Sequence, residues 1–423
     1  MSSYKSYSSY KDSGIAWFPN MPTEWKSIKV KHVFKERIDK GFPEEPLLAA
    51  TQTKGVVRKE NYETRTVTAQ KDFHLLKLVR LGDFVISLRS FQGGIEIAHE
   101  QGIISPAYTV MIPQVSIDRE YFKYLYKAKY FIDGLTTFVT GIREGQNIDY
   151  SKFRRSLVPL PSKPEQTAIA NFLDKKTAEI KQFIELKEKT IALLKERKTA
   201  IINQAVTKGL NPNVEMKDSG IEWLGEVPKH WEVKRLKSSF YLRKDTVGEN
   251  SDNYTLLSLT QNGVIERDME NLQGKFPASF DTYQIVEEED LIFCLFDMDV
   301  TPRTVGYSKF HGMITGAYTV LKTYKNLVKE YFYWLCLSAD EGKKLRRNYT
   351  GLRSTIKKDT FLSMSVSFPP KNEQQQIVEY LNQKTSTIDK IIATITTQIK
   401  HQKELRKTLI NDVVTGKIKV ENN

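Results

Sequence analysis

Cysteine is scarce in this chain, and long apolar runs are missing from it. Cys294 and Cys336 are the only cysteines among 423 residues, too few for a disulfide framework or a four-ligand zinc site, so we expect two buried thiols. The sequence contains no uncharged apolar run of 18 residues and begins with no apolar stretch of the secretory kind. We therefore expect no membrane-spanning helix and a cytoplasmic location.

Motifs for phosphate binding and catalysis are also missing. The 22 glycines never form Gly-x-Gly, and the Gly-Lys pairs at Gly274, Gly342 and Gly416 are not followed by Ser or Thr, which excludes the common nucleotide cradles. No His-Glu-x-x-His occurs, so a zinc protease site is excluded. The single Pro-Pro pair, at 369–370, follows Phe368 instead of the polar residue that an amino-methyltransferase places there. The sequence predicts a non-catalytic chain with no metal site.

What the chain does have is basic charge. Lys and Arg number 64 against 51 Asp and Glu, which gives a net charge of +13 and a pI near 9.3. A positive field of this kind attracts polyanions such as nucleic acid or an anionic membrane surface. Charge alone does not choose between them.

The sequence is an internal duplication, and this determines its organisation. Residues 11–17 (Lys-Asp-Ser-Gly-Ile-Ala-Trp) recur as residues 217–223 (Lys-Asp-Ser-Gly-Ile-Glu-Trp), an offset of 206. Other short stretches recur at offsets of 206 to 210: Pro22 and Trp25 as Pro228 and Trp231, Ala107–Val110 as Ala317–Val320, Thr140–Arg143 as Thr350–Arg353, and Glu165-Gln166 as Glu373-Gln374. The recurring tryptophans predict packing anchors, because base-reading residues would differ between two reading surfaces.

Each copy starts with a mixed part and ends with a helical one. Short apolar runs such as 83–86 and 290–293, with Gly-rich turns between them, are typical of α+β structure. In the second part apolar residues recur in steps of three and four, the period of a coiled-coil seam. The seam residues singled out are Leu173, Ile180, Ile184 and Ile191 in copy one, and Ile388, Ile392, Ile399 and Leu409 in copy two.

The helix limits are marked as well. Ser162 and Glu165 form a possible capping box before the first helix, and Gly209 and Gly416 follow the last apolar positions. A helix of about 45 residues is roughly 65 to 70 Å long and needs a partner helix. We predict an α+β fold, with two pseudo-symmetric mixed α/β domains joined by two long helices in an antiparallel coiled coil. The predicted segments are an N-terminal tail and anchor (1–24), domain 1 (25–160), helix 1 (161–210), a linker (211–230), domain 2 (231–368), helix 2 (369–418) and a C-terminal tail (419–423).

Candidate DNA-binding residues are selected by residue type and position. Arg, Gln and Asn suit base edges, whereas clustered Lys and Arg usually contact phosphates. Arg143 and Arg353 occupy equivalent places after a Thr-Gly turn, and residues 343–347 form a basic cluster. The candidates are Arg89, Ser90, Gln92, Arg143, Gln146, Asn147, Arg154, Arg303, Lys343, Lys344, Arg346, Arg347 and Arg353.

At these residues the chain resembles the specificity subunit of type I restriction-modification systems. Residues 209–231 look like that family's inter-repeat signature, and residues 161–166 look like the start of its conserved helix. The resemblance covers residues 11 to 418, although Phe18-Pro19-Asn20 departs from the Leu224-Gly225-Glu226 of the second copy.

This resemblance implies two target recognition domains that each read half of a split double-stranded DNA sequence. The two helices would set the spacer and dock two methyltransferase subunits with S-adenosylmethionine, and through these two endonuclease subunits that use ATP and Mg²⁺. It implies adenine methylation by the complex and no cofactor in this chain. The alternative is an architectural nucleic-acid binder without sequence preference.

Overall fold

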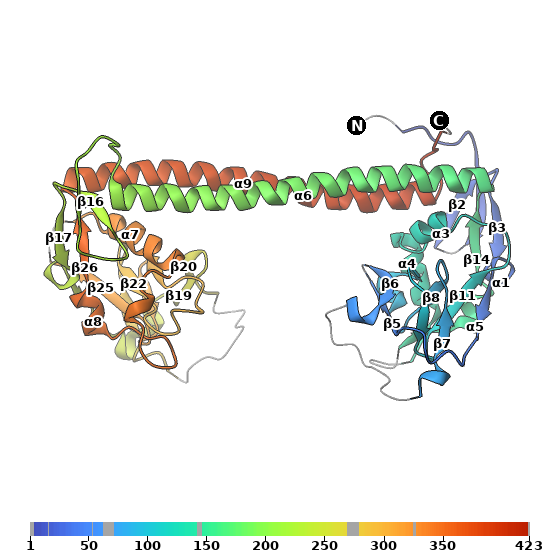
Figure 1. Ribbon diagram of the computed structural model, residues 1–423, viewed down its shortest axis with the longest axis horizontal. Helices are drawn as coiled ribbons and strands as arrows, with labels where there is room; N and C mark the ends of the chain where they lie inside the picture. Colours follow the sequence, from blue (N-terminus) through green and yellow to red (C-terminus); the bar gives the residue numbers. More distant parts are fainter. Residues whose placement is uncertain are drawn as a thin grey trace. The chain divides into compact units, whose positions relative to one another are not determined.

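The computed structural model describes residues 4–15, 17–52, 54–61, 72–141, 146–268, 279–324 and 327–421. Contacts divide the chain into two compact units. Unit 1 comprises Met1–Lys187 and Thr396–Asn423, and unit 2 comprises Glu188–Ile395. Each unit therefore combines one mixed domain with a segment of each long helix (Figure 1). The predicted α+β class is confirmed.

Unit 1 begins with short strands, continues into the start of the first long helix, and also contains the end of the second long helix. Its elements are β1 (Tyr10–Ile15), β2 (Phe18–Pro22), β3 (Lys26–Lys29), α1 (Val30–Val33), β4 (Phe34–Arg37), β5 (Leu48–Thr51), β6 (Gly55–Arg58), β7 (Lys77–Val79), β8 (Phe84–Ile86), α2 (Ser90–Gly93), β9 (Glu96–Ile97), β10 (Gly102–Ile104), β11 (Thr109–Pro113), α3 (Arg119–Leu125), α4 (Lys129–Leu135), β12 (Val139–Thr140), β13 (Asn147–Ile148), α5 (Tyr150–Phe153), β14 (Leu157–Leu160) and the start of α6 (Lys163–Lys208).

Unit 2 repeats the pattern after the end of α6. Its elements are β15 (Met216–Asp218), β16 (Glu226–Pro228), β17 (Glu232–Arg235), β18 (Phe240–Leu242), β19 (Leu257–Thr260), β20 (Gly263–Glu266), β21 (Gln284–Val286), β22 (Leu291–Phe293), β23 (Val305–Tyr307), β24 (Gly312–Ile314), β25 (Thr319–Thr323), α7 (Lys329–Glu341), α8 (Lys358–Ser363), β26 (Ser365–Phe368) and the start of α9 (Lys371–Val414).

The two units share most of their sheet topology. A four-stranded antiparallel sheet has the order β4-β11-β8-β9 in unit 1 and β18-β25-β22-β23 in unit 2. The hairpins β5-β6 and β19-β20 correspond, as do the long-range pairs β3-β14 and β17-β26. The apolar runs read from the sequence are the central strands β8 and β22, and all their residues are buried. The duplication is therefore structural as well as sequential.

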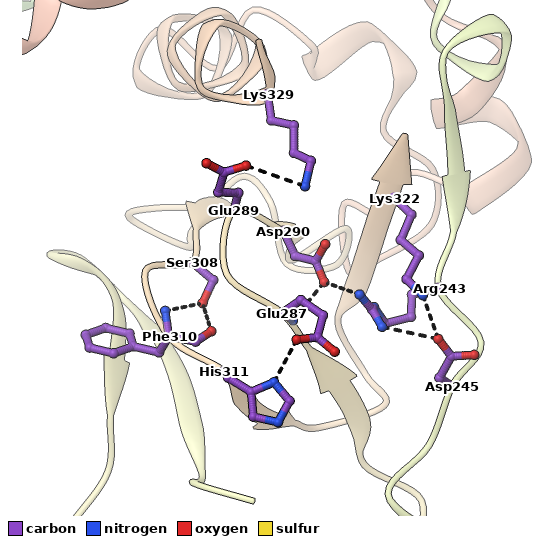
Figure 2. A network of polar contacts seen from close by, with 10 residues as sticks. All are labelled: Arg243, Asp245, Glu287, Glu289, Asp290, Ser308, Phe310, His311, Lys322 and Lys329. Carbon is purple, nitrogen blue, oxygen red and sulfur yellow. Dashed lines mark hydrogen bonds and ion pairs between the residues drawn. The ribbon is translucent and has the colours of Figure 1, made fainter. Parts of the chain in front are cut away.

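A buried arginine–aspartate pair stabilises each sheet. In unit 2, Arg243 Nη2 lies 2.8 Å from Asp290 Oδ2, with side chains 4% and 2% exposed (Figure 2). Asp290 also accepts a bond from the Glu287 amide at 2.9 Å, and burial raises the pKa of Asp290 against the pull of Arg243. Unit 1 repeats the pair with Arg37 Nε 2.9 Å from Asp83 Oδ2. This pairing fixes the start of the central strand in both units.

The long helices pack antiparallel. In unit 1 the beginning of α6, with Leu173, shares a core with the end of α9, at Leu409 and Val413. In unit 2 the end of α6, at Ile202, shares a core with the beginning of α9, at Leu381. Gly209 (φ +73°) and Gly416 (φ +71°) follow the helices in the left-handed conformation, as the sequence predicts. Among the described residues, no helix is both long and apolar enough to cross a membrane.

The tryptophan anchors are confirmed, whereas the capping box is only half formed. Trp25 and Trp231 are fully buried, and their indole nitrogens donate to Glu165 Oε1 at 2.9 Å and to Glu373 Oε2 at 3.0 Å. Ser162 Oγ accepts a long 3.4 Å bond from the Glu165 amide. The Glu165 carboxylate does not return to the cap, because it binds the Trp25 indole instead.

Both cysteines are free, as the sequence predicts. Cys294 is buried and Cys336 is half-buried. Burial raises the pKa of both thiols, that of Cys336 to about 12, so neither is a reactive thiolate near neutral pH.

Candidate nucleic-acid interface

In unit 2, the loop after the central strand and the Thr-Gly turn are brought together. The turn closes through a bridge between Thr350 and Thr355. Its backbone is bound to the loop after β22 by hydrogen bonds from Asp297 N to Arg353 O (2.6 Å) and from Ile356 N to Leu295 O (2.9 Å). We call residues 296–297 together with residues 351–354 the unit 2 tip.

Arg353 is held in place at this tip. Its Nε donates to Asp297 Oδ1 at 3.0 Å, and its Nη2 donates to the second carboxylate oxygen. The guanidinium carbon lies 4.9 Å from the centre of the Phe296 ring. The bond to Arg353 lowers the pKa of Asp297. The Arg353 side chain is still 67% exposed, so donors of its five N–H groups remain available to an acceptor such as a guanine edge.

Leu352 is the residue that sequence reasoning missed at this place. It is fully exposed, beside the fixed guanidinium. A large apolar side chain on a rigid turn is suited to contact a base or a thymine methyl group. Phe296 and Asp297 were missed too. The repeat offset of 207 maps them onto Arg89 and Ser90, and this signal could have identified them.

Unit 1 brings the equivalent elements together with different residues, and we call residues 89–92 together with residues 146–147 the unit 1 tip. The loop after β8 carries α2, which lies beside β13. Arg89 and Gln92 are exposed on it, whereas Ser90 is buried and accepts a 2.9 Å bond from the Ser87 amide. Asn147 is exposed on β13 and accepts from Thr140 Oγ1 at 3.2 Å, and Gln146 is half-buried. Arg143 lies outside the described residues.

The basic cluster at 343–347 divides into inward and outward residues. Lys343 binds Asp340 Oδ1 at 2.8 Å and the Thr301 carbonyl at 2.7 Å. Lys344 is half-buried, donates to Asn203 and Ser338, and has its pKa lowered by burial. The side chains of these two lysines therefore bind groups within the protein.

Within the cluster at 343–347, the cations that face solvent are the two arginines. Arg346 and Arg347 are 71% and 79% exposed, each paired with one carboxylate, Asp299 and Glu222. Arg154 is also exposed, and Arg303 is half-buried.

The seam residues serve the pairing of the two helices. Leu173, Ile180, Ile184, Ile388, Ile399 and Leu409 are buried, and Ile191 and Ile392 are half-buried. A docking partner would therefore meet the outer sides of the helices. Exposed apolar residues there are Leu186, Leu193, Ile391 and Leu405. They lie off the seam frame, which is why the periodicity does not select them.

Within the described ranges no group of three or more His, Cys, Asp or Glu is placed to hold a metal ion. The two units share one arrangement of sheets and carry different exposed residues in their equivalent loops.

Part of the chain is similar in sequence to known proteins. The model described as "Type I restriction modification DNA specificity domain" matches residues 228–401. The putative type I restriction enzyme MjaX specificity subunit of Methanocaldococcus jannaschii is 25% identical over 287 residues, 65% of this chain and 62% of that protein. The MjaVIII specificity subunit of the same organism is 23% identical over 300 residues, 65% of each protein. The matched region thus spans less than two thirds of these relatives.

Solved structures share the fold. A chain from work on "complex assembly and conformational transition of the type I R-M system" has a TM-score of 0.69 at 12% identity, over 94% of this chain and 99% of that chain. The HsdS subunit from Thermoanaerobacter tengcongensis has a TM-score of 0.53 at 14% identity, over 94% and 98%. The chain is thus similar in sequence to type I restriction-modification specificity subunits, and it shares its fold with these solved structures.

Proposed function

We propose that this chain is the DNA sequence-recognition subunit of a type I restriction-modification complex, and that each unit reads one half of a bipartite double-stranded target. The proposal rests on one observation: the two units share their sheets and buried ion pairs but carry different residues at their exposed tips. The sheets and buried ion pairs of the two units correspond, but Arg89 in unit 1 is replaced by Phe296 in unit 2. An architectural binder that only neutralises phosphates would not need two different tips, so this alternative is not favoured.

The residues at the tips suit base reading. Arg353 in unit 2 matches a guanine edge, and Gln92 and Asn147 in unit 1 match adenine edges. Arg154, Arg303, Arg346 and Arg347 would contact phosphates, which position a protein on DNA without reading its sequence. Competition with random DNA tests this assignment. The assembled complex should prefer its target by at least about a thousandfold, and equal affinity for random DNA would contradict it.

The two helices would set the spacer between the half-sites. Four residues, about one turn, inserted into both helices, near Leu194 and near Gln402, lengthen each by about 6 Å. At 3.4 Å per base pair this corresponds to a spacer longer by about one or two base pairs. Methylation mapped over a library of spacer lengths measures the change. An unchanged spacer in an active complex would assign the distance to the partner subunits.

The chemistry would come from partner subunits in the cytoplasm. Two adenine-specific methyltransferase subunits would bind S-adenosylmethionine and dock on the helices, and two endonuclease subunits would bring ATP and Mg²⁺ chemistry. Leu186 and Leu405, 63% and 42% exposed, offer apolar contacts for docking. Copurification decides this point. Two S-adenosylmethionine-binding chains per copy are expected, and methyl transfer by the isolated chain would contradict the proposal.

A further inference from the structure

The start of each long helix carries the same glutamate–tryptophan contact, so the molecule contains two copies of one site. Glu165 and Glu373 each lie in the first turn of their helix. Each accepts a hydrogen bond from a fully buried indole, that of Trp25 or Trp231. The two copies of this contact can therefore be compared residue by residue.

In unit 1 a tyrosine fills this site. The Tyr7 hydroxyl donates to Glu165 Oε1 at 2.6 Å, and the Tyr7 ring meets the Trp25 ring edge to face at 5.9 Å. Lys419 Nζ lies 5.6 Å from the centre of the Tyr7 ring. Only 6% of Tyr7 is exposed. The segments that contain Tyr7 and Lys419 meet at this site, where the Lys419 amide donates to the Lys5 carbonyl at 2.8 Å.

In unit 2 a single segment runs past the equivalent place. The chain passes from the end of α6 through residues 209–215 into β15. Asn213, which corresponds to Tyr7 at the repeat offset of 206, is exposed and donates its amide to Asn211 Oδ1 at 3.0 Å. It therefore leaves the place of Tyr7 unfilled.

A pocket of about 390 Å³ lies there instead. Two of its lining residues, Glu373 and Asn211, correspond at an offset of 208 to the Tyr7 neighbours Glu165 and Lys419. The full lining is Lys208, Leu210, Asn211, Val214, His230, Pro370, Asn372, Glu373 and Gln376. The pocket is thus the unfilled equivalent of the Tyr7 site.

The polar groups of the pocket indicate what fits. His230 Nε2 lies 2.7 Å from Glu373 Oε2, the same oxygen that accepts from Trp231. Within the described part of the chain, Glu373 Oε1 remains for a further donor. The Glu373 carboxylate is a strong acceptor for a hydroxyl, and the Lys208 ammonium lines the same pocket. Leu210, Val214 and Pro370 offer apolar contacts to a ring.

We propose that this pocket receives a tyrosine side chain from an extended segment of another protein chain, in the way that unit 1 receives its own Tyr7. In unit 1 the Tyr7 hydroxyl shares Glu165 Oε1 with the Trp25 indole, whereas in unit 2 His230 already shares the indole-bound Glu373 Oε2. The incoming tyrosine hydroxyl therefore donates to the other oxygen, Glu373 Oε1, and its ring packs beside Trp231. The bound segment runs along residues 209–215. Two segments of the chain lie side by side at this place in unit 1, whereas unit 2 has only one. This inference concerns a protein contact and does not depend on DNA reading.

A labelled peptide with the sequence of residues 4–10 is the probe, because this segment already fills the equivalent site. Fluorescence polarisation is measured with the full chain in the absence of DNA. We expect saturable binding of one peptide per chain. The same peptide with Tyr7→Phe should bind at least about tenfold more weakly, since it lacks the hydroxyl that meets a charged acceptor.

Variants of the chain distinguish the two sites. Glu373→Gln should weaken peptide binding, and the matched Glu165→Gln should leave it unchanged. Val214→Trp, at the half-buried edge of the pocket, should block binding without disturbing the core, and circular dichroism confirms folding. Absence of binding overturns the proposal. So does binding that persists in Val214→Trp, or that is lost in Glu165→Gln alone, because the peptide would then bind elsewhere or replace the chain's own segment.

Discussion

Units 1 and 2 have the same buried contacts but different exposed residues at their tips. The ion pairs Arg37–Asp83 and Arg243–Asp290, the sheet orders and the buried tryptophans correspond. The loops after β8 and β22 do not, because one forms the short helix α2 and the other forms the seat of Arg353. The buried contacts therefore tolerate little change, whereas the exposed turns can vary without unfolding the unit.

The largest expected effect tests the shared frame. Asp290→Ala leaves the Arg243 charge buried without its partner and should destabilise unit 2 by about 3 to 5 kcal/mol. Asp83→Ala should destabilise unit 1 by less, because Arg37 is 12% exposed against 4% for Arg243. Thermal unfolding of both variants measures the two losses.

The control replaces the whole pair by Arg243→Met with Asp290→Leu. It should recover most of the stability, since no buried charge remains. Equal and small losses in both single variants would show that the pairs do not hold the sheets.

The second prediction tests the tips. Arg353→Ala should weaken binding to one half-site by about 1 to 3 kcal/mol if Arg353 contacts a base bidentately. Arg347→Ala, the matched phosphate variant, should weaken all DNA alike and reduce the salt dependence. Binding to libraries that vary each half-site separately measures both. If Arg353→Ala affects target and random DNA equally, Arg353 does not read sequence.

The third prediction concerns a cap present in only one unit. Asp118 accepts from the amides of Glu120 and Tyr121 at the start of α3, whereas Val328 precedes α7 without a side-chain cap. Asp118→Ala should cost unit 1 at least about 1 kcal/mol, because it also removes the acceptor of a 2.7 Å bond from Thr167 Oγ1. Asp118→Asn should cost less, because Asn caps nearly as well. Urea unfolding compares the variants. Equal stability of the Ala variant and the native chain would contradict this.

The smallest effect is a pKa shift at the unit 2 tip. The bond to Arg353 holds the Asp297 pKa below its ordinary value of 3.8. Since the folded pKa is the lower one, the contribution of Asp297 to stability is present above the unfolded pKa and disappears as the pH falls through the folded pKa. Arg353→Ala should raise the Asp297 pKa toward 3.8, and Arg347→Ala should leave it unchanged. NMR titration of the carboxyl carbon measures both.

The placement of single polar residues follows from contacts that a sequence does not reveal. Residue type suggested a role in DNA binding for Lys344 and Ser90, but Lys344 binds Asn203 and Ser90 closes a turn with Ser87. The glutamate of the capping box was similarly taken by Trp25, a residue 140 positions away. Such partners come from other elements and leave no local pattern.

The duplication, the mixed domains, the two helices with their glycine ends and the burial of Trp25 and Trp231 could be predicted from the amino-acid sequence. These follow from repeats and periodicity, which are local and therefore readable. The pairing of Arg353 with Asp297, 56 residues away, and the filling by Tyr7 of a site that is open in unit 2 could not be predicted in this way, because they depend on the three-dimensional fold. The physical reason is that exposure and pairing depend on which elements pack over a residue, and that packing is decided by the whole fold.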